Sequence, residues 1–147
     1  MSAPSSTNVR QVSAITAEGA LHALRVGADE CLKAGVRVSI TVVDPALTLI
    51  AFLKIDGAAP HSVETSRRKA QTAASTGRPS GWMSADLALT LPLGANNLLT
   101  NIPGGVPLKF DGTLVGGIGI AGGTVEQDAA VAQAIMTALG ADPLPHI

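Results

Sequence analysis

The chain has 147 residues, of which 10 are Lys or Arg and 11 are Asp or Glu, a size typical of one domain with its own hydrophobic core. The charges are scattered and nearly balanced, which argues against binding to nucleic acid or to an anionic membrane surface, and no apolar run is long enough to span a bilayer. With two Phe, one Trp and no Tyr, the core must be built from Ala, Val, Leu and Ile.

Met1 to Arg10 is polar and lacks the apolar segment of a secretory signal, and residues 1–13 are predicted to form a flexible arm before a single domain at 14–142. Thr16 is a candidate N-cap for a helix that runs to about Lys33. Its apolar stripe is predicted to contain Ala17, Ala20, Leu21, Leu24, Ala28, Cys31 and Leu32.

Cys31 lies within this stripe and is interpreted as a buried, inert thiol. As the single cysteine of the chain it has no partner for an internal disulfide, which fits a reducing, cytoplasmic setting. His22 lies on the opposite, polar face of the helix. It is interpreted as a solvated or interface residue, with a role as a ligand as the alternative.

A β-hairpin and a second helix are predicted next. Val36–Val43 is rich in β-branched residues, Asp44-Pro45-Ala46 forms a turn, and Leu47–Lys54 is the returning strand. A loop at 56–61 then leads into a helix from Ser62 to about Ser75. The polar face of this helix is predicted to consist of Ser62, Thr65, Arg68, Lys69 and Thr72.

Residues 77–106 are the least regular part of the sequence. A short helix is predicted from Gly81 to Ala88, and Pro92 and Gly94 interrupt the apolar segment that follows it. So long a connection in a compact domain is typical of a functional segment or an interface. It is predicted to end in a sharp turn at 103–107.

A second hairpin is predicted from Leu108–Phe110 and Thr113–Ala121, followed by a helix to about Leu139. Thr124 is the predicted N-cap of that helix, and Gln127 completes a capping box. The element order, with two or three strands in this second half, predicts an α+β fold in which helices pack against an antiparallel sheet.

The strand Thr113–Ala121 contains several glycines. Side chains alternate along a strand, so one face is predicted to carry Leu114, Gly116, Ile118 and Ile120, and the other Val115, Gly117, Gly119 and Ala121. Glycines inside a strand indicate that a helix, a neighbouring subunit or a ligand approaches the backbone closely. The literal pattern G-x-G-x-x-G also occurs here, but its glycines lie within the strand, so we interpret it as close packing and not as a nucleotide site.

A set of short motifs, in this order and spacing, resembles the GlcG/HbpS family, which is also seen as the C-terminal domain of PduO-type proteins. The motifs are Val42-Val43-Asp44, Asp56-Gly57-Ala58, Lys69-Ala70, Thr72-Ala73, Pro103-Gly104-Gly105-Val106-Pro107, Val115-Gly116-Gly117-Ile118-Gly119, Gly122-Gly123 and Gln127-Asp128. The resemblance covers residues 16–139. Ala121 departs from it, because many members have Ser before the Gly-Gly pair.

The resemblance implies a profilin-like antiparallel sheet of about five strands flanked by α-helices, and homo-oligomers that range from dimers to larger rings. It also implies haem binding in some members, a link to haem degradation or redox sensing in others, and no settled activity in the rest. The resemblance therefore specifies the fold better than the function.

The best candidate site lies between residues 56 and 69. Asp56 and His61 belong to the loop that leads into the helix carrying Arg67, Arg68 and Lys69. Cations beside the positive end of a helix suit a carboxylate or propionate group, and His61 would serve as an acid/base or a metal ligand. The wall of this pocket is predicted to come from the glycines Gly104, Gly105, Gly117 and Gly119.

Two functions remain open. The first is an oligomeric binding protein for haem or another anionic ligand, with His61 or His22 as the axial ligand, although the scarcity of aromatic residues counts against haem. The second is a cofactor-free lyase, isomerase or hydrolase for a small carboxylated metabolite. In that enzyme, His61 or Asp56 moves a proton while Arg68 or Lys69 holds a carboxylate.

Motifs of other site classes are missing from the sequence. It has no cysteine cluster and no histidine pair at zinc-binding spacing, so a dedicated zinc site is not expected, and it has no G-x-S-x-G elbow. His146 falls in a C-terminal tail that is predicted to be mobile. The smooth Ala/Gly face and the long apolar connection predict a homodimer or a larger homo-oligomer.

Overall fold

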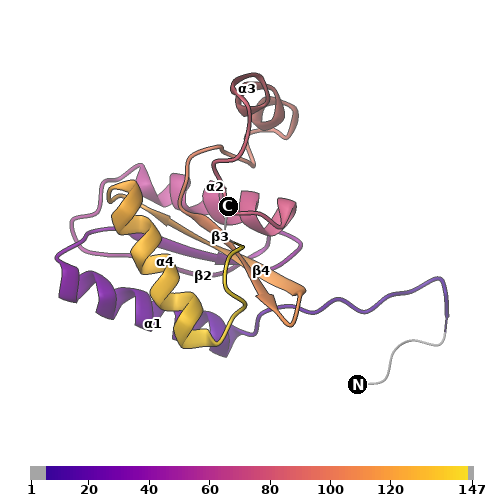
Figure 1. Cartoon of the computed structure of the whole chain (residues 1–147), viewed down its shortest axis with the longest axis horizontal. Coiled ribbons are helices and arrows are strands. Elements are labelled where there is room, and N and C mark those ends of the chain that lie inside the picture. Colours follow the sequence, from indigo (N-terminus) through magenta and orange to yellow (C-terminus); the bar gives the residue numbers. More distant parts are fainter. Residues whose placement is uncertain (1–5, 146–147) are drawn as a thin grey trace.

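The computed structural model describes residues 6–145, so His146 and the first five residues of the predicted arm lie outside the described part. Helices and strands are arranged as an α+β domain, as predicted (Figure 1). In chain order they are α1 (Ala17–Ala34), β1 (Ser39–Val43), β2 (Leu49–Lys54), α2 (Ser62–Thr76), α3 (Ala85–Gly94), β3 (Gly105–Phe110), β4 (Thr113–Ala121) and α4 (Val125–Leu139).

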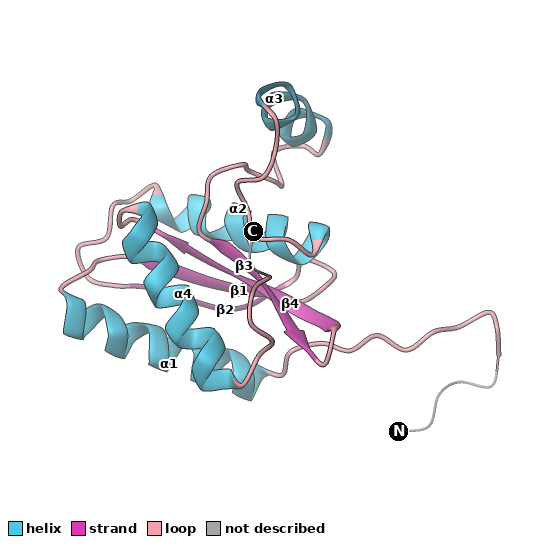
Figure 2. Ribbon diagram, viewed as in Figure 1, coloured by secondary structure: helices cyan, strands magenta, loops and turns pink. Residues whose placement is uncertain are grey.

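The strands form one antiparallel sheet in the order β2-β1-β4-β3, with α2 on one face and α1 and α4 on the other (Figure 2). The described residues thus contain four strands, one fewer than expected. The turn predicted at 103–107 is also shorter than expected, because β3 begins at Gly105 and includes Pro107. Proline is tolerated there because β3 is an edge strand, whose outer side needs no backbone donor.

Helices α1 and α4 enclose the main hydrophobic core against their face of the sheet. Ile40 of β1, Ile118 and Ile120 of β4, and Ile135 of α4 are fully buried in it. Both helix starts are confirmed: Thr16 caps α1, and the predicted capping box is present at the start of α4. This face therefore follows the usual pattern, in which aliphatic side chains fill the space between layers.

The apolar stripe predicted for α1 correctly includes the buried residues Ala20 and Cys31, but it also includes residues that are exposed. Leu21 is 58% exposed and Leu32 is 86% exposed. The helix turns a narrow row of small residues, including Gly27, toward the sheet and α4, because both of these approach it closely. The two leucines lie outside that row.

Helix α2 covers the other face at very short range. A Cβ atom built on Gly119 would collide with the carbonyl oxygen of Ser66, and one built on Gly117 would collide with that of Ala70. The neighbour that these strand glycines accommodate is therefore a helix, which was one of the three alternatives left open by the sequence.

Paired hydroxyl groups also join α2 to the sheet. The Oγ atoms of Ser39 and Ser62 are 2.8 Å apart, and Thr41 Oγ1 lies 2.7 Å from Ser66 Oγ. Much of the predicted polar face of α2 therefore points into the protein, where the sheet supplies hydrogen-bond partners that helical spacing cannot reveal. The members of that face that are buried are Ser62, Lys69 and Thr72.

A β-bulge corrects the predicted faces of β4. The pairing with β3 shifts between Leu108, which faces Gly116, and Lys109, which faces Leu114, so Val115 is the extra residue. Val115 was expected on the glycine face, but it is buried in the same hydrophobic core as Ile118. A bulge interrupts the alternation of side chains between the two faces of a strand, so the face predicted for Val115 from alternation is wrong.

The helix predicted at 81–88 lies further along the chain, as α3. Ser84 caps it by accepting a hydrogen bond from the amide of Leu87, a start signal that the prediction overlooked. Pro92 lies inside α3 and not at its end, so this short helix tolerates the one hydrogen bond that a proline cannot donate. Figure 1 shows α3 standing away from the rest of the domain on two long connections.

The described part of the arm, residues 6–13, extends away from the domain, and the chain joins the sheet where the amide of Ile15 donates to the carbonyl of Val115 at 2.9 Å. None of the helices within residues 6–145 has the length and apolar character needed to cross a membrane.

Candidate functional site

Two cavities contain the histidines that the sequence singled out. The first, here called the Lys69 cavity, measures about 270 Å³ and lies where the start of α2, the end of β4 and the start of α4 meet. It brings together parts of the predicted 56–69 and 103–107 segments. Its lining comprises Ala59, His61, Thr65, Lys69, Ile102, Pro103, Ala121, Gly122, Gly123, Val125 and Asp128.

Lys69 lines this cavity from α2. It is only 2% exposed, and its Nζ atom donates to the carbonyl oxygen of Ile120 at 2.8 Å and to Asp128 Oδ2 at 3.3 Å. Asp128 is 3% exposed, and its Oδ1 atom accepts a hydrogen bond from the amide of Gly123 at 3.0 Å. The ion pair therefore ties α2, β4 and α4 together in a place that is almost dry.

Burial acts on both members of the pair. It lowers the pKa of Lys69 and raises the pKa of Asp128, because each charged form loses hydration. The attraction between the two groups opposes both changes, and the Gly123 amide further favours the Asp128 carboxylate. The two pKa values thus move toward each other, which makes proton exchange within the pair easier than between the free side chains.

Two predicted wall glycines pack directly against Lys69. A Cβ atom on Gly104 would lie 2.7 Å from Lys69 Nζ, and one on Gly105 would collide with the Lys69 carbonyl oxygen. Gly104 also has a φ of 127°, which residues with side chains rarely adopt. These glycines allow the turn into β3 to close over the lysine.

The remaining predicted residues separate. His61 lies on the rim of the Lys69 cavity at the start of α2, and its imidazole makes no capping hydrogen bond. Asp56 instead lines a different cavity, next to Cys31 and Arg37. Arg67 and Arg68 lie on the outer side of α2, away from both of these cavities.

Arg67 is exposed, and Arg68 forms a 3.7 Å ion pair with Glu64 one turn earlier. Both line a small hollow next to residue 96, away from Lys69. Gly117 and Gly119 are covered by the backbone of α2 and line none of the cavities described here.

Asp128 is the residue of this site that the sequence reasoning missed. It was quoted as part of a family motif, but nothing in the local pattern pairs it with a lysine 59 positions earlier. One signal was available: an acidic residue in the first turn of a helix is common, but one on the buried side of that turn needs a partner.

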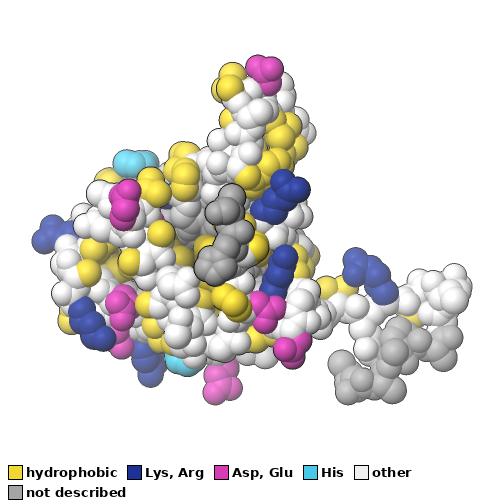
Figure 3. Space-filling model, viewed as in Figure 1, with side chains coloured by type: hydrophobic (Ala, Val, Ile, Leu, Met, Phe, Trp, Pro, Cys, Tyr) yellow, Lys and Arg dark blue, Asp and Glu magenta, His cyan; other side chains and the backbone are white. Residues whose placement is uncertain are grey.

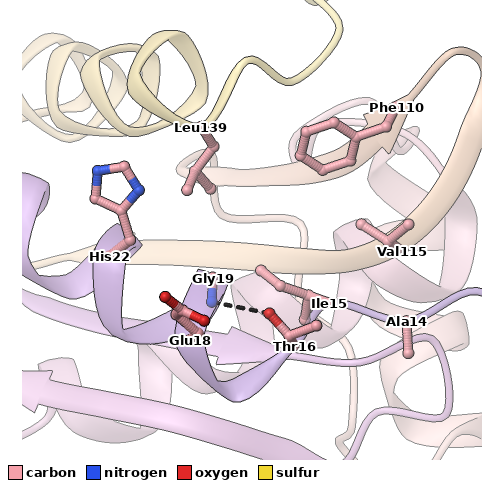
Figure 4. Close-up of a pocket in the computed structure, with 9 residues that line it drawn as sticks. All are labelled: Ala14, Ile15, Thr16, Glu18, Gly19, His22, Phe110, Val115 and Leu139. Atoms are coloured by element: carbon pink, nitrogen blue, oxygen red, sulfur yellow. Dashed lines mark hydrogen bonds between the residues drawn. The ribbon is translucent and has the colours of Figure 1, made fainter.

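The second cavity, here called the His22 cavity, measures about 540 Å³ and lies between α1, the β3–β4 hairpin and the end of α4 (Figure 4). Its polar lining consists of Thr16, Glu18 and His22, and its other lining residues are small or apolar. His22 is exposed on α1, and its imidazole projects from α1 toward the side where Leu139 lies. The apolar part is lined by Ala14, Ile15, Gly19, Phe110, Val115 and Leu139.

The described residues contain no group of three or more His, Cys, Asp or Glu side chains placed to hold a metal ion. A metal ligated by protein groups alone has no candidate site within residues 6–145. The His22 cavity does provide one imidazole beside an apolar space, which is the arrangement that a metal carried by its own macrocycle requires.

Comparison with known proteins identifies relatives of the whole fold. A family model described as "Haem degrading protein HbpS-like" matches residues 15–137. The protein GlcG of Escherichia coli strain K12 is 35% identical over 98 residues, which are 66% of this chain and 73% of GlcG.

Solved structures agree with this result. The crystal structure of HbpS superposes with a TM-score of 0.81 at 33% identity, covering 95% of this chain and 99% of HbpS. A crystal structure of a PduOC:heme complex gives a TM-score of 0.81 at 26% identity, covering 90% of this chain and 99% of that chain. Together with the strand order and the helices on both faces of the sheet, these matches show that the chain belongs to the HbpS-like family.

Proposed function

We propose that this protein binds haem, or a similar planar ligand with an apolar body and anionic groups, in the His22 cavity. The observation that carries the proposal is a cavity of about 540 Å³ with apolar walls and a single imidazole beside them. The relative crystallised as a PduOC:heme complex supports haem as the ligand class.

The residues present fit the apolar body and the iron of such a ligand. Phe110, Val115, Leu139 and Ile15 offer apolar surface to a macrocycle, and His22 offers one nitrogen as an axial ligand to its iron. Haem in this place would supply a redox-active iron, while the chain would orient the macrocycle and shield one of its faces from water. Phe110 also answers the objection that aromatic residues are scarce, because one of the two Phe side chains lines this cavity.

The Lys69 cavity, where the sequence reasoning placed the ligand, fits haem less well. It has half the volume of the His22 cavity, and the amine that would meet a propionate group is already bound to Asp128 and to the carbonyl of Ile120. The haem proposal therefore rests on His22 and not on His61.

Titration with hemin tests this proposal. We expect a shifted Soret band that saturates with one haem per chain, and we expect His22→Ala to remove the shift and weaken binding at least tenfold. His61→Ala is the matched control, because it removes an exposed histidine from the other cavity, and it should leave the spectrum unchanged. No shift in the wild-type protein, or loss of the shift in His61→Ala alone, would contradict the proposed place of binding.

A second candidate function uses the Lys69 cavity, as a cofactor-free enzyme or binding site for a small carboxylated metabolite. The specific observation in its favour is the convergence of Lys69, Asp128 and His61 on one small space. Asp56 and Arg68, which the sequence reasoning included, lie elsewhere and have no part in this version.

We also propose that the protein forms a homo-oligomer in which α3 contacts another copy. Leu89 is 69% exposed and Leu93 is 72% exposed on a helix that stands apart from its own domain, and hydrophobic side chains gather on this projection (Figure 3). Light scattering should give a mass of at least two chains. The variant Leu89→Glu/Leu93→Glu should lower that mass, whereas Leu32→Glu, which changes an even more exposed leucine on α1, should leave it unchanged.

A further inference from the structure

Lys69 combines burial with access to a cavity. The side chain of Lys33, in contrast, is 75% exposed, as is normal for lysine. Burying an ion pair costs hydration free energy that the attraction between the charges offsets only in part, and a hydrophobic pair of similar volume often stabilises a fold as well. A buried Lys–Asp pair that also lines a cavity therefore suggests a chemical use for the amine.

The atoms around Nζ leave it able to react. An ammonium group has three N–H donors, and two of them are used, by Ile120 O and Asp128 Oδ2. The turn at Gly104 packs closely on one side of Nζ, and the Lys69 cavity, which this side chain lines, is the space from which a substrate would approach. The nitrogen is thus held by two acceptors, in contact with a carboxyl group that can exchange protons with it.

The direction of both pKa changes agrees with this use. Burial lowers the pKa of Lys69 and raises the pKa of Asp128, which favours transfer of a proton from the ammonium group to the carboxylate. That transfer converts an inert ion pair into a neutral amine, which is a nucleophile, and a carboxylic acid, which is a proton donor.

We propose that Lys69 forms an imine with the carbonyl carbon of a short 2-oxo acid, and that Asp128 moves the protons of this reaction. The inference rests on the second candidate function only in using the same cavity, and it is independent of haem binding in the His22 cavity.

The reaction balances without a cofactor. The neutral Lys69 amine attacks the carbonyl carbon, a C–N bond forms, and the carbonyl π electrons move to oxygen, which takes a proton from Asp128. The nitrogen of this carbinolamine returns a proton to the Asp128 carboxylate. Asp128 then protonates the hydroxyl group, water leaves, and the nitrogen lone pair forms the C=N bond. The amine, the carbonyl group and the Asp128 proton thus become a protonated imine, water and the Asp128 carboxylate, with no change of oxidation state.

The size and charge of the cavity select the substrate class. A space of about 270 Å³ suits a molecule of a few carbon atoms and is too small to enclose a macrocycle. His61 on the rim and the positive N-terminal end of α4 beside Gly123 favour a carboxylate at the mouth, while Lys69 and Asp128 lie deeper. A short 2-oxo acid places its carboxylate and carbonyl on adjacent carbons, as this arrangement requires.

Reductive trapping tests the inference in the unmodified protein. Pyruvate and sodium cyanoborohydride are added at neutral pH, and peptide mapping by mass spectrometry locates the carboxyethyl group. We expect Lys69 to be labelled at least tenfold faster than the exposed Lys33, although it is far less accessible. Asp128→Asn, which keeps the lysine and a similar shape, should slow labelling of Lys69 at least tenfold and leave Lys33 unchanged, and Lys33→Met should leave Lys69 labelling unchanged.

A parallel calorimetric titration with pyruvate separates the two levels of the proposal. Binding that weakens in His61→Ala, without a label on Lys69, would overturn the imine and leave a small-acid site in place. Labelling confined to Lys33, Lys54 and Lys109, together with no measurable binding, would overturn both. Label on Lys69 in the wild-type protein supports the inference even if Lys69→Met fails to fold.

Discussion

The two faces of the sheet are packed by opposite means. On the face of α1 and α4, large aliphatic side chains such as Ile40 and Ile135 fill the gap between the layers. On the face of α2, the glycines of β4 and small residues of α2 bring the backbones almost into contact, and buried hydroxyl pairs join them. Packing on the first face therefore depends on the volume of side chains, which can shift to accept small changes. Packing on the second face depends on the distance between backbones, which can change very little.

The two cavities also lie on different faces of the sheet. The His22 cavity opens beside the aliphatic face, where layers held apart by side chains leave apolar space at their edge. The Lys69 cavity lies at the end of the close-packed face, where polar groups have been drawn inside with α2. An apolar ligand and a small polar substrate are thus suited to different faces of one domain.

The largest expected difference between the faces comes from adding one methyl group. In Gly119→Ala the new Cβ would collide with the backbone carbonyl of Ser66, which cannot rotate away, so we expect a loss of about 3 kcal/mol or more in the free energy of unfolding. The matched control is Gly27→Ala on the other face, where the new Cβ would meet the flexible tips of Ile40 and Ile135. Overpacking there is offset by the better helix propensity of Ala, so the change should be about 1 kcal/mol or less.

Urea unfolding monitored by circular dichroism measures both variants. Equal losses in the two variants would show that the faces do not differ in the way described here.

A smaller effect is expected for the hydroxyl pairs. Ser66 Oγ donates to the carbonyl of Val63, so the proton of its bond with Thr41 comes from Thr41. Thr41→Val keeps the shape and removes that donor, for a loss of about 1 kcal/mol, whereas Ser66→Ala leaves the buried Thr41 hydroxyl without its partner, for a loss of about 2 kcal/mol. Thermal or urea unfolding should reproduce this order. The reverse order would mean that Ser66, and not Thr41, is the donor.

The last prediction concerns the dependence of stability on pH. Because burial raises the pKa of Asp128 above the unfolded value of 3.8, the native state binds a proton before the unfolded state does as the pH falls. The wild-type protein should therefore gain stability relative to the double variant Lys69→Met/Asp128→Asn as the pH falls from neutral toward 3.8, by about 1.4 kcal/mol for each unit by which the pKa is raised. Below 3.8 the difference should become constant.

The pKa of Lys69 affects stability in the same way at alkaline pH. Its pKa lies below the unfolded value of 10.5, so the unfolded state binds the proton more readily and the wild-type protein should gain relative stability as the pH rises toward 10.5. Urea titrations of both proteins across this range measure the difference. A relative loss of wild-type stability on acidification would identify an ordinary stabilising salt bridge.

Local patterns in the sequence were enough to predict most elements. Caps at Thr16 and Thr124, the turn after Asp44 and the start of α2 at Ser62 all depend on residues within one or two turns of each other, and each is confirmed. The family resemblance rested on the same short motifs, and the family model confirms it. The bulge at Val115 was missed because nothing in β4 alone records which residue of β3 lies opposite.

The candidate sites were predictable only in part. The loop before α2 and the turn before β3 were expected to meet, and His61, Lys69 and Pro103 do line one cavity. Asp56 and Arg68 were placed there by nearness in sequence, but the loop turns one away and the helix turns the other outward. Neighbours along a helix or loop differ in direction, and the direction is decided by whatever packs against them.

By itself, the sequence determined most of the elements, the caps at Thr16 and Thr124, the family and the presence of a bare strand that something must approach, because propensity, capping and alternation act over a few residues. Only the tertiary structure decided that α2 is what approaches it, that Asp128 receives the buried Lys69, and that His22 stands beside an apolar cavity. Each of these joins residues far apart along the chain, and their meeting depends on how whole layers pack, which no local pattern encodes.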